Sequence, residues 1–383
     1  MKQNMKSILL SILILSFSIL AFSQSKEKSD FVGEFYEWEG KTQNSKPDQI
    51  RVDPFNRNIV WFTLPPVHGV GRFDFTKKEY TEFKEKGRYR PDGLIIDKHG
   101  ILWFGEQGTG TLGKFDPVTE EFEHFFAPYK GANLAIPTVD HDGNIWVVDH
   151  ENNIINRFNP KEEKFTMFRL PTPKSWVTDV KADSKNRIWF SCYNSDRIGV
   201  IDADRKTITE YEVPEEGVGP AFMAIDSQDR IWFTMWISNK IGMFDPKSKK
   251  FSEYEFPMKN PGPSAMTIGK DDVIYFSTKY LNSIVKFDPK QEGHFTYFTI
   301  PTPKSGQKDG ICVDDKNVIW LTEMGKNKIA RLVIGKEDDL ELPGKSYKNR
   351  TIQPGYRVKA KKTVTSAYSE KTTRVRLLRP IKD

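Results

Sequence analysis

The sequence has few of the residues that crosslink a chain or hold a metal ion. Its 383 residues include two cysteines, Cys192 and Cys312, and six histidines. No Cys-x-x-Cys pair or zinc-type spacing occurs, and the two cysteines are far apart along the chain. These absences exclude a disulfide framework and a thiol redox motif, so we expect two free thiols.

Several catalytic signatures are also missing. The chain has no glycine-rich phosphate loop, no Ser-His-Asp order and no calcium loop with a closing glutamate. No segment has a strong helical periodicity of 3.6 residues, which argues against a helical or mixed fold.

Long apolar runs are lacking except near the start, where the chain is apolar from Ile8 to Phe22. This run is too short to span a membrane, and it ends in Ala21-Phe22-Ser23, with small residues at the positions that signal peptidase recognises. Residues 1–23 therefore predict a cleaved signal peptide. We expect a secreted or periplasmic protein without a transmembrane segment.

The basic excess is confined to the two ends of the chain. The whole sequence has 58 Lys and Arg against 52 Asp and Glu, but residues 345–383 alone carry twelve basic and two acidic residues. When that tail is left out together with Lys2 and Lys6, the remaining body has 44 basic and 50 acidic residues. A mildly acidic body argues against nucleic-acid binding, which needs a basic stripe.

A strand-like motif built on Trp-Phe recurs seven times. Other segments of each repeat have β-branched and aromatic residues at period two, bounded by turns such as Asp245-Pro-Lys. A period in the low forties with one aromatic per repeat predicts an all-β fold, a β-propeller with one four-stranded blade per repeat. The aromatic anchors, 42 to 45 residues apart, are Trp61, Trp103, Trp146, Trp189, Trp232, Tyr275 and Trp320.

The seventh repeat lacks a fourth strand, and the missing piece precedes the first repeat. Glu34-Phe-Tyr-Glu-Trp38 has the pattern of a fourth strand, so we predict that it pairs beside residues 328–334 and closes a seven-bladed ring. Residues 24–340 would form the propeller. The basic tail, residues 341–383, does not fit the repeat; it would either pack under the disc or lack fixed structure.

On one face of the disc, the loop residues are expected to differ from blade to blade. The loop into each first strand and the loop after each Trp-Phe strand should share that face. Carboxylates there would suit a hard divalent cation, and aromatics would suit a ring-bearing ligand. The residues at these positions include Asp92, Glu106, Asp149, His150, Trp176, Tyr193, Trp236, Ser264, Asp309 and Glu323.

The repeat resembles that of the virginiamycin B lyase family. The resemblance rests on Trp-Phe-Thr or Trp-Phe-Ser, on the segments beginning at Asn239 (Asn-Lys-Ile-Gly-Met-Phe-Asp-Pro) and Phe251 (Phe-Ser-Glu-Tyr-Glu-Phe-Pro), and on Pro171-Thr-Pro and Pro301-Thr-Pro. It covers about residues 31–335. It implies a propeller that opens a cyclic depsipeptide by elimination, with magnesium on glutamates and a histidine as general base.

The family pattern is only partly kept. By the resemblance, Glu323 keeps one glutamate position, Gln307 stands at the other, Asp309 stands at the general base, and Ser264 stands at a further histidine. An unperturbed Asp is a far weaker base than His at neutral pH.

Two functions follow as alternatives. The first is a metal-assisted elimination or ring opening of a cyclic or lactone-like substrate, as in a carbon–oxygen lyase. Glu323, Gln307 and Glu106 would then hold magnesium, and Asp309 or His150 would be the base. The second is a non-catalytic propeller of the cell envelope that binds a small molecule or peptide through Tyr193, Trp236, Tyr280 and Ser264. We expect a monomer in either case. A lactonase-type calcium propeller fits less well, because that family's spaced Asn, Asp and Glu motifs are absent.

Overall fold

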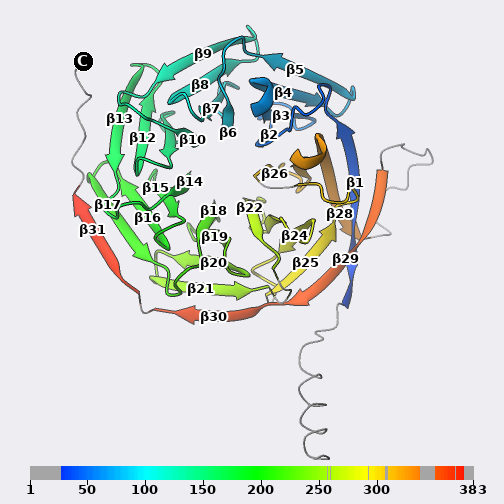
Figure 1. The fold of residues 1–383 in the computed structure, drawn as a ribbon. Helices are drawn as coiled ribbons and strands as arrows, with labels where there is room; N and C mark the ends of the chain where they lie inside the picture. Colours follow the sequence, from blue (N-terminus) through cyan, green and yellow to red (C-terminus); the bar gives the residue numbers. More distant parts are fainter. Residues whose placement is uncertain are drawn as a thin grey trace, which may run out of the picture.

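Four-stranded antiparallel sheets stand around a common axis in the computed structural model (Figure 1). The structure describes residues 27–256, 258, 260–291, 293–306, 309–336, 350–366 and 368–374. In these residues the all-β fold is confirmed, with strands linked by tight turns and two short 3-10 helices. The predicted signal peptide, residues 1–23, lies outside the described residues.

The strands group in chain order into seven four-stranded blades. Blades 1 to 3 consist of β2 (Ile50–Val52), β3 (Ile59–Leu64), β4 (Gly69–Asp74) and β5 (Glu79–Lys84); β6 (Pro91–Ile96), β7 (Leu102–Glu106), β8 (Thr111–Asp116) and β9 (Glu121–Phe126); and β10 (Leu134–Val139), β11 (Ile145–Asp149), β12 (Ile154–Asn159) and β13 (Lys164–Arg169).

Blades 4 to 6 consist of β14 (Val177–Ala182), β15 (Ile188–Cys192), β16 (Arg197–Asp202) and β17 (Thr207–Glu212); β18 (Pro220–Ile225), β19 (Ile231–Met235), β20 (Lys240–Asp245) and β21 (Lys250–Glu255); and β22 (Pro263–Ile268), β23 (Ile274–Thr278), β24 (Ser283–Phe287) and β25 (His294–Thr299). Blade 7 combines β26 (Ile311–Val313), β27 (Ile319–Glu323) and β28 (Lys328–Lys336) with β1 (Glu27–Glu39). The 3-10 helices η1 (Pro65–Val67) and η2 (Met324–Lys326) follow β3 and β27.

The N-terminal strand closes the ring, as predicted. β1 runs antiparallel to β28, with Phe31 opposite Lys336 and Glu39 opposite Lys328. Blade 7 is therefore made from both ends of the propeller, which removes two free sheet edges.

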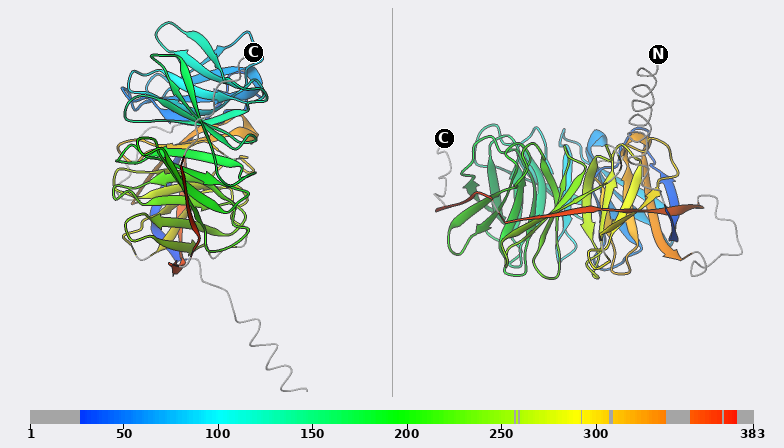
Figure 2. Two further views of the ribbon diagram at one scale, coloured as in Figure 1. Left: turned by 90° about the vertical axis from the view of Figure 1, so that its left-hand side faces the viewer. Right: turned by 90° about the horizontal axis from the view of Figure 1, so that it is seen from below.

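The C-terminal segment adds strands around the outside of the disc. β29 (Arg350–Lys359) pairs with both β25 and β1, β30 (Lys361–Thr365) pairs with β21, and β31 (Glu370–Arg374) pairs with β17. Figure 2 shows this segment as a belt along the outer rim. For residues 350–366 and 368–374, both sequence expectations, packing under the disc or no fixed structure, therefore differ from what the structure shows; the rest of the tail lies outside the described residues.

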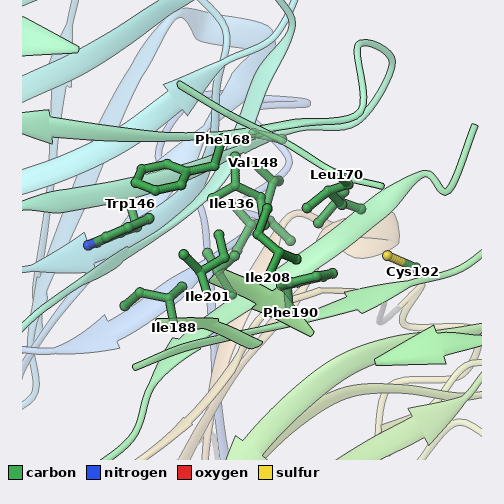
Figure 3. Packing of buried hydrophobic residues seen from close by; sticks show 14 residues of the cluster. Ile136, Trp146, Val148, Phe168, Leu170, Ile188, Phe190, Cys192, Ile201 and Ile208 are labelled. Carbon is green, nitrogen blue, oxygen red and sulfur yellow. The ribbon is translucent and has the colours of Figure 1, made fainter. Parts of the chain in front are cut away.

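The core lies between neighbouring blades. The Trp-Phe strands of blades 4 and 5, β15 and β19, are buried along their whole length because both faces of a blade are covered by the adjacent blades. Between blades 3 and 4, Trp146 and Phe168 pack against Ile188, Phe190 and Ile201 (Figure 3). Cys192 belongs to the same cluster, and both cysteines are buried and free, as expected.

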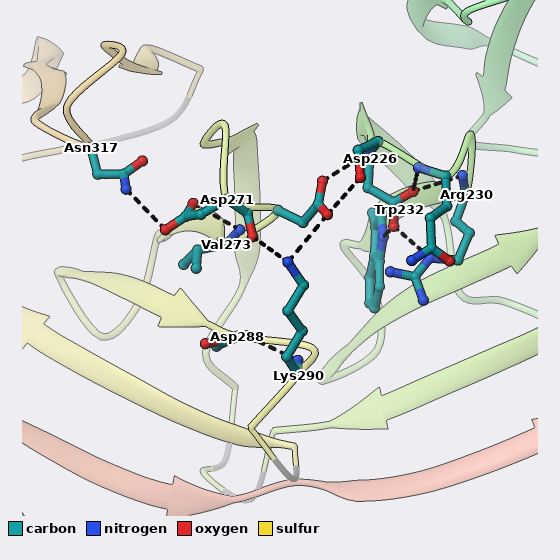
Figure 4. Close-up of polar contacts among 11 residues, drawn as sticks. Asp226, Arg230, Trp232, Asp271, Val273, Asp288, Lys290 and Asn317 are labelled. Carbon is teal, nitrogen blue, oxygen red and sulfur yellow. Dashed lines mark hydrogen bonds and ion pairs between the residues drawn. The ribbon is translucent and has the colours of Figure 1, made fainter.

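On one face of the disc, an aspartate in each of five turns receives the indole of the same blade. Asp226, for example, accepts Trp232 Nε1 at 2.9 Å and the backbone N–H groups of Gln228 and Arg230 (Figure 4). Blade 6 lacks both partners, since Tyr275 replaces the tryptophan and Gly269 the aspartate. The equivalent indole bonds, 2.8 to 3.0 Å long, join Trp61 to Asp53, Trp103 to Asp97, Trp146 to Asp140 and Trp189 to Asp183.

Candidate functional site

The loops opposite the aspartate turns form a second, more varied face, called here the loop face. In blades 4 to 6, backbone hydrogen bonds join the loop after the second strand to the loop before the first strand. Tyr193 donates to the Trp176 carbonyl (3.0 Å), Trp236 to that of Gly219 (3.1 Å) and Lys279 to that of Gly262 (2.9 Å). The two kinds of loop therefore share one face, as the sequence predicted.

Aromatic side chains from blades 4 to 6 lie along this face; Trp176, Tyr193, Trp236 and Tyr280 are called here the aromatic arc. Tyr193 meets Trp236 edge to face with ring centroids 6.1 Å apart. Lys279 Nζ lies 5.6 Å from the Trp236 ring and 5.5 Å from the Tyr280 ring. Trp176 is 41% exposed and Tyr280 63% exposed. Tyr193, Trp236 and Tyr280 are ligand contacts predicted from the sequence, and the structure brings Tyr193 and Trp236 together.

Trp176 has a backbone conformation that suits glycine. Its φ is +53°, and the backbone bonds above place it at the position held by Gly219 and Gly262 in the next two blades, whose φ is +60°. A bulky residue in this region is strained, and such strain clusters at functional sites. Blade 4 thus holds a partly exposed indole where its neighbours have no side chain. Comparing these three loops in the sequence would have singled out Trp176.

His150 lies at the edge of the arc but is held in place. Its ring stacks on Trp176 with centroids 5.6 Å apart, and its Nδ1 contacts the Val177 carbonyl oxygen. The neighbouring Asp149 is fully buried, and its carboxylate accepts bonds from the Tyr129 hydroxyl (2.9 Å) and the Asn133 backbone N–H (3.1 Å). Asp149 therefore stabilises the loop instead of pairing with His150.

The last residue of each second strand is buried and does not ring the channel mouth. The sequence predicts these side chains on the loop face, where a ligand could reach them. They are not accessible, because strand residues alternate and this position shares the interblade side with the apolar residue two places earlier. Every member is at most 1% exposed: Leu64, Glu106, Asp149, Cys192, Met235, Thr278 and Glu323.

Glu106 is bound within blade 2. Its Oε2 accepts Thr111 Oγ1 at 2.6 Å and lies 2.9 Å from His124 Nδ1. Burial lowers the pKa of His124, but Glu106 and then Glu85 outweigh it, so this pKa lies above its ordinary value. Glu106 and Glu323 lie in blades 2 and 7, each with its own partner, so the structure does not bring them to one ion.

Glu323 is a buried carboxyl beside a second carboxyl. Burial and then the charge of Glu37 on β1 raise its pKa to about 9, while Lys328 acts in the opposite direction. Glu37 itself accepts the Thr302 backbone N–H at 3.1 Å. At neutral pH Glu323 is therefore protonated next to Glu37.

These neighbours are a poor fit for the magnesium that the resemblance implies. Lys328 already supplies a positive charge near Glu323, whereas a magnesium ligand should be an ionised carboxylate. Across the described residues, no three His, Cys, Asp or Glu side chains gather as a metal would need. Gln307, the other predicted ligand, lies outside the described residues. Magnesium binding stays a prediction.

Asp309 and Ser264 are placed separately. Asp309, 7% exposed, lines a cavity of about 390 Å³ among the inner strands, on the axis of the ring. Ser264 is fully buried in β22. Neither the base role of Asp309 nor ligand binding by Ser264 is tested by this arrangement.

Within the described residues, no helix is both long and apolar enough to cross a membrane.

Comparison with known families gives one family match. The model of the Virginiamycin B lyase family matches residues 131–367. No curated protein sequence matches the chain.

Solved structures with the same fold include virginiamycin B lyase and a streptogramin B lyase. The chain is similar to virginiamycin B lyase from Staphylococcus aureus at 24% identity and a TM-score of 0.73, over 79% of this chain and 99% of that one. A catalytically inactive form of that enzyme with quinupristin matches at 24% identity and a TM-score of 0.72, over the same shares of the two chains. The extracellular domain of a hybrid two-component system from B. thetaiotaomicron matches at 16% identity and a TM-score of 0.59, covering 78% of this chain and 42% of that one.

Proposed function

Because this chain belongs to the virginiamycin B lyase family, we propose that its loop face binds a cyclic, ring-bearing ligand of the streptogramin type through the aromatic arc. Support for the ligand class comes from the solved relative with quinupristin. Export of the protein stays a prediction of residues 1–23.

The observation that carries this proposal is the strained Trp176. A left-handed backbone costs a bulky residue on the order of 1–3 kcal/mol, and the two neighbouring blades avoid that cost with Gly219 and Gly262. Trp176, Tyr193, Trp236 and Tyr280 together offer flat apolar surfaces, and Lys279 adds a cation beside two of the rings. Aromatic surfaces with few polar groups are typical of sites for large apolar ligands.

Binding is tested with quinupristin and the purified full chain, followed by isothermal titration calorimetry. Trp176→Gly should weaken binding by about tenfold or more, since buried tryptophans dominate interfaces. The same change relieves the strained backbone, so the free energy of unfolding should not fall. Lost binding can then be told apart from misfolding.

A matched control is Phe55→Ala, which removes a 72% exposed aromatic from the aspartate-turn face. This variant should bind quinupristin like the wild type. The proposal fails if the wild type does not bind quinupristin, or if Trp176→Gly and Trp236→Ala both bind it unchanged.

A second candidate is elimination with Asp309 as base, favoured by the burial of Asp309 at the central cavity. The base would take a proton from the carbon adjacent to the one that carries the leaving ester oxygen. The carbon–oxygen bond then breaks to give an alkene and a carboxylate, so the opened product has the mass of its parent. Hydrolysis would add one water. Chromatography with mass detection separates these outcomes, and activity that survives in Asp309→Asn would exclude this role.

A further inference from the structure

We infer that the central channel contains a second binding site, in which Arg51 and Gln49 receive the carboxylate of a small organic acid. This site is distinct from the aromatic arc, and it does not depend on the proposed function of the loop face.

The site is the axial cavity of about 390 Å³. Inner strands β2, β14, β18, β22 and β26 line it, together with Ile136 of β10. Part of the wall is apolar, formed by side chains such as Ile136, Phe222 and Met266, and part is polar, formed by Gln49, Arg51 and Lys181. A mixed wall of this kind suits an acid with an apolar body better than an inorganic ion.

Of the two cations that line this cavity, Lys181 has a carboxylate partner. Lys181 Nζ lies 2.5 Å from Asp179 Oδ1. The same Asp179 also accepts the backbone N–H groups of Val180 and Met223, each at 2.8 Å, so its oxygens are already used.

Arg51 has no such partner. It donates one hydrogen bond, to the Ile50 carbonyl at 2.7 Å, and no carboxylate of the described residues lies in ion-pair contact with it. Burial lowers the pKa of Arg51, an effect that the charges of Cys312 and Asp179 oppose. Burial likewise lowers the pKa of Lys181, Asp179 raises it, and the nearby charge of Arg51 lowers it again. A bound anion would relieve this repulsion between the two cations.

Gln49 supplies the second donor. It is 2% exposed, its Nε2 has no hydrogen-bond partner, and it lies two residues before Arg51 on the same wall. A buried amide N–H without a partner is costly unless a ligand or water receives it. A carboxylate has two acceptor oxygens, which match the guanidinium and the amide. Asp309 is the other carboxylate in the wall.

The test uses the full chain and three sodium salts, benzoate, acetate and sulfate, against sodium chloride at equal ionic strength. Benzoate should raise the melting temperature most and sulfate least. Arg51→Met, which keeps the length of the side chain, should weaken benzoate binding by about tenfold or more, because a hydrogen bond to a charged group contributes roughly 1.5–3 kcal/mol. Arg205→Met is the matched control, since Arg205 is 83% exposed on an outer turn.

A second variant guards against a fold defect. Gln49→Glu keeps the shape of the side chain and places a permanent carboxylate beside Arg51, so it should abolish the benzoate response without lowering the melting temperature of the ligand-free protein. The inference is overturned if no anion stabilises the wild type relative to chloride, if sulfate stabilises it more than benzoate, or if Gln49→Glu responds to benzoate like the wild type.

Discussion

At the scale of single residues, one buried position of the repeat holds different acidic side chains, with different polar partners, in three of the blades. The last residue of the second strand is Glu106 against His124 in blade 2, Asp149 against Tyr129 in blade 3, and Glu323 beside Glu37 in blade 7. Buried polar groups persist only when they have partners or change protonation. These acids therefore act mainly on stability.

Glu323→Gln should remove a pH dependence of stability. The pKa of Glu323 is raised to about 9 in the folded chain, so the folded state keeps its proton where the unfolded state loses it. Its contribution is complete below the unfolded pKa and is lost as pH rises toward 9. Glutamine imitates the protonated carboxyl, so at pH 8 we expect the variant to be more stable than the wild type by about 1–3 kcal/mol.

The measurement is urea unfolding at pH 5, 7 and 8.5, with Glu162→Gln, an exposed carboxyl, as control. Parallel pH profiles for the wild type and Glu323→Gln would contradict the prediction. The same assay addresses magnesium, since an ion held by Glu323 would stabilise the wild type and not the variant.

At the scale of elements, β29 links two neighbouring blades, 6 and 7. It pairs with β25 of blade 6 on one side and with β1 of blade 7 on the other, so both blades belong to one hydrogen-bonded sheet. β30 and β31 give blades 5 and 4 a fifth strand each. The basic segment thus covers outer strand edges that would otherwise be open to other chains.

Gly355→Ala should loosen this belt at β29. A Cβ on Gly355 would lie 2.5 Å from the Phe31 carbonyl oxygen and 2.8 Å from the Phe298 ring, and a backbone atom cannot give way cheaply. Overpacking of this kind costs about 1–3 kcal/mol. Hydrogen exchange should show faster exchange of β29 amides in the variant.

The matched control is Thr363→Ala, at an exposed site of β30. If Gly355→Ala and Thr363→Ala exchange alike throughout β29, the close approach at Gly355 does not constrain the belt.

At the scale of the whole molecule, the propeller is a ring whose blades stabilise one another. Each interblade core draws on two neighbours, as Trp146 and Phe190 show between blades 3 and 4. Closure through β1 makes the first and last repeats depend on each other as well. A break in one interface is therefore expected to affect the entire ring.

Phe35→Ala tests this closure. Phe35 of β1 is fully buried with Phe298, Ile300 and Leu332, and deletion of such a ring costs about 3–5 kcal/mol. Urea unfolding followed by tryptophan fluorescence should keep one transition with an earlier midpoint, because the blades unfold together. Glu39→Ala, exposed on the same strand, should leave the midpoint unchanged. A separate early transition for blade 7 alone would show that closure is not cooperative.

The sequence by itself determined the repeat, the strands and the closure of the ring. The anchors from Trp61 to Trp320 recur because each blade must bury the same strand between two neighbours, and that requirement is local and periodic. The order of the loops also fixed which face diversifies, and with it the placement of Tyr193 and Trp236.

Only the tertiary structure decided which polar residues face solvent, the channel or a neighbouring blade. Glu106 and Glu323 come directly after the motif, and their side chains lie buried between blades. Tyr193 and Trp236 stand one position later in their own repeats, and their side chains lie on the surface, because successive side chains of a strand point to opposite sides. Arg51 and Lys181 are distant in sequence and meet only because blades 1 and 4 enclose the same axis. Contacts made across a ring depend on how its blades close, and no local pattern records them.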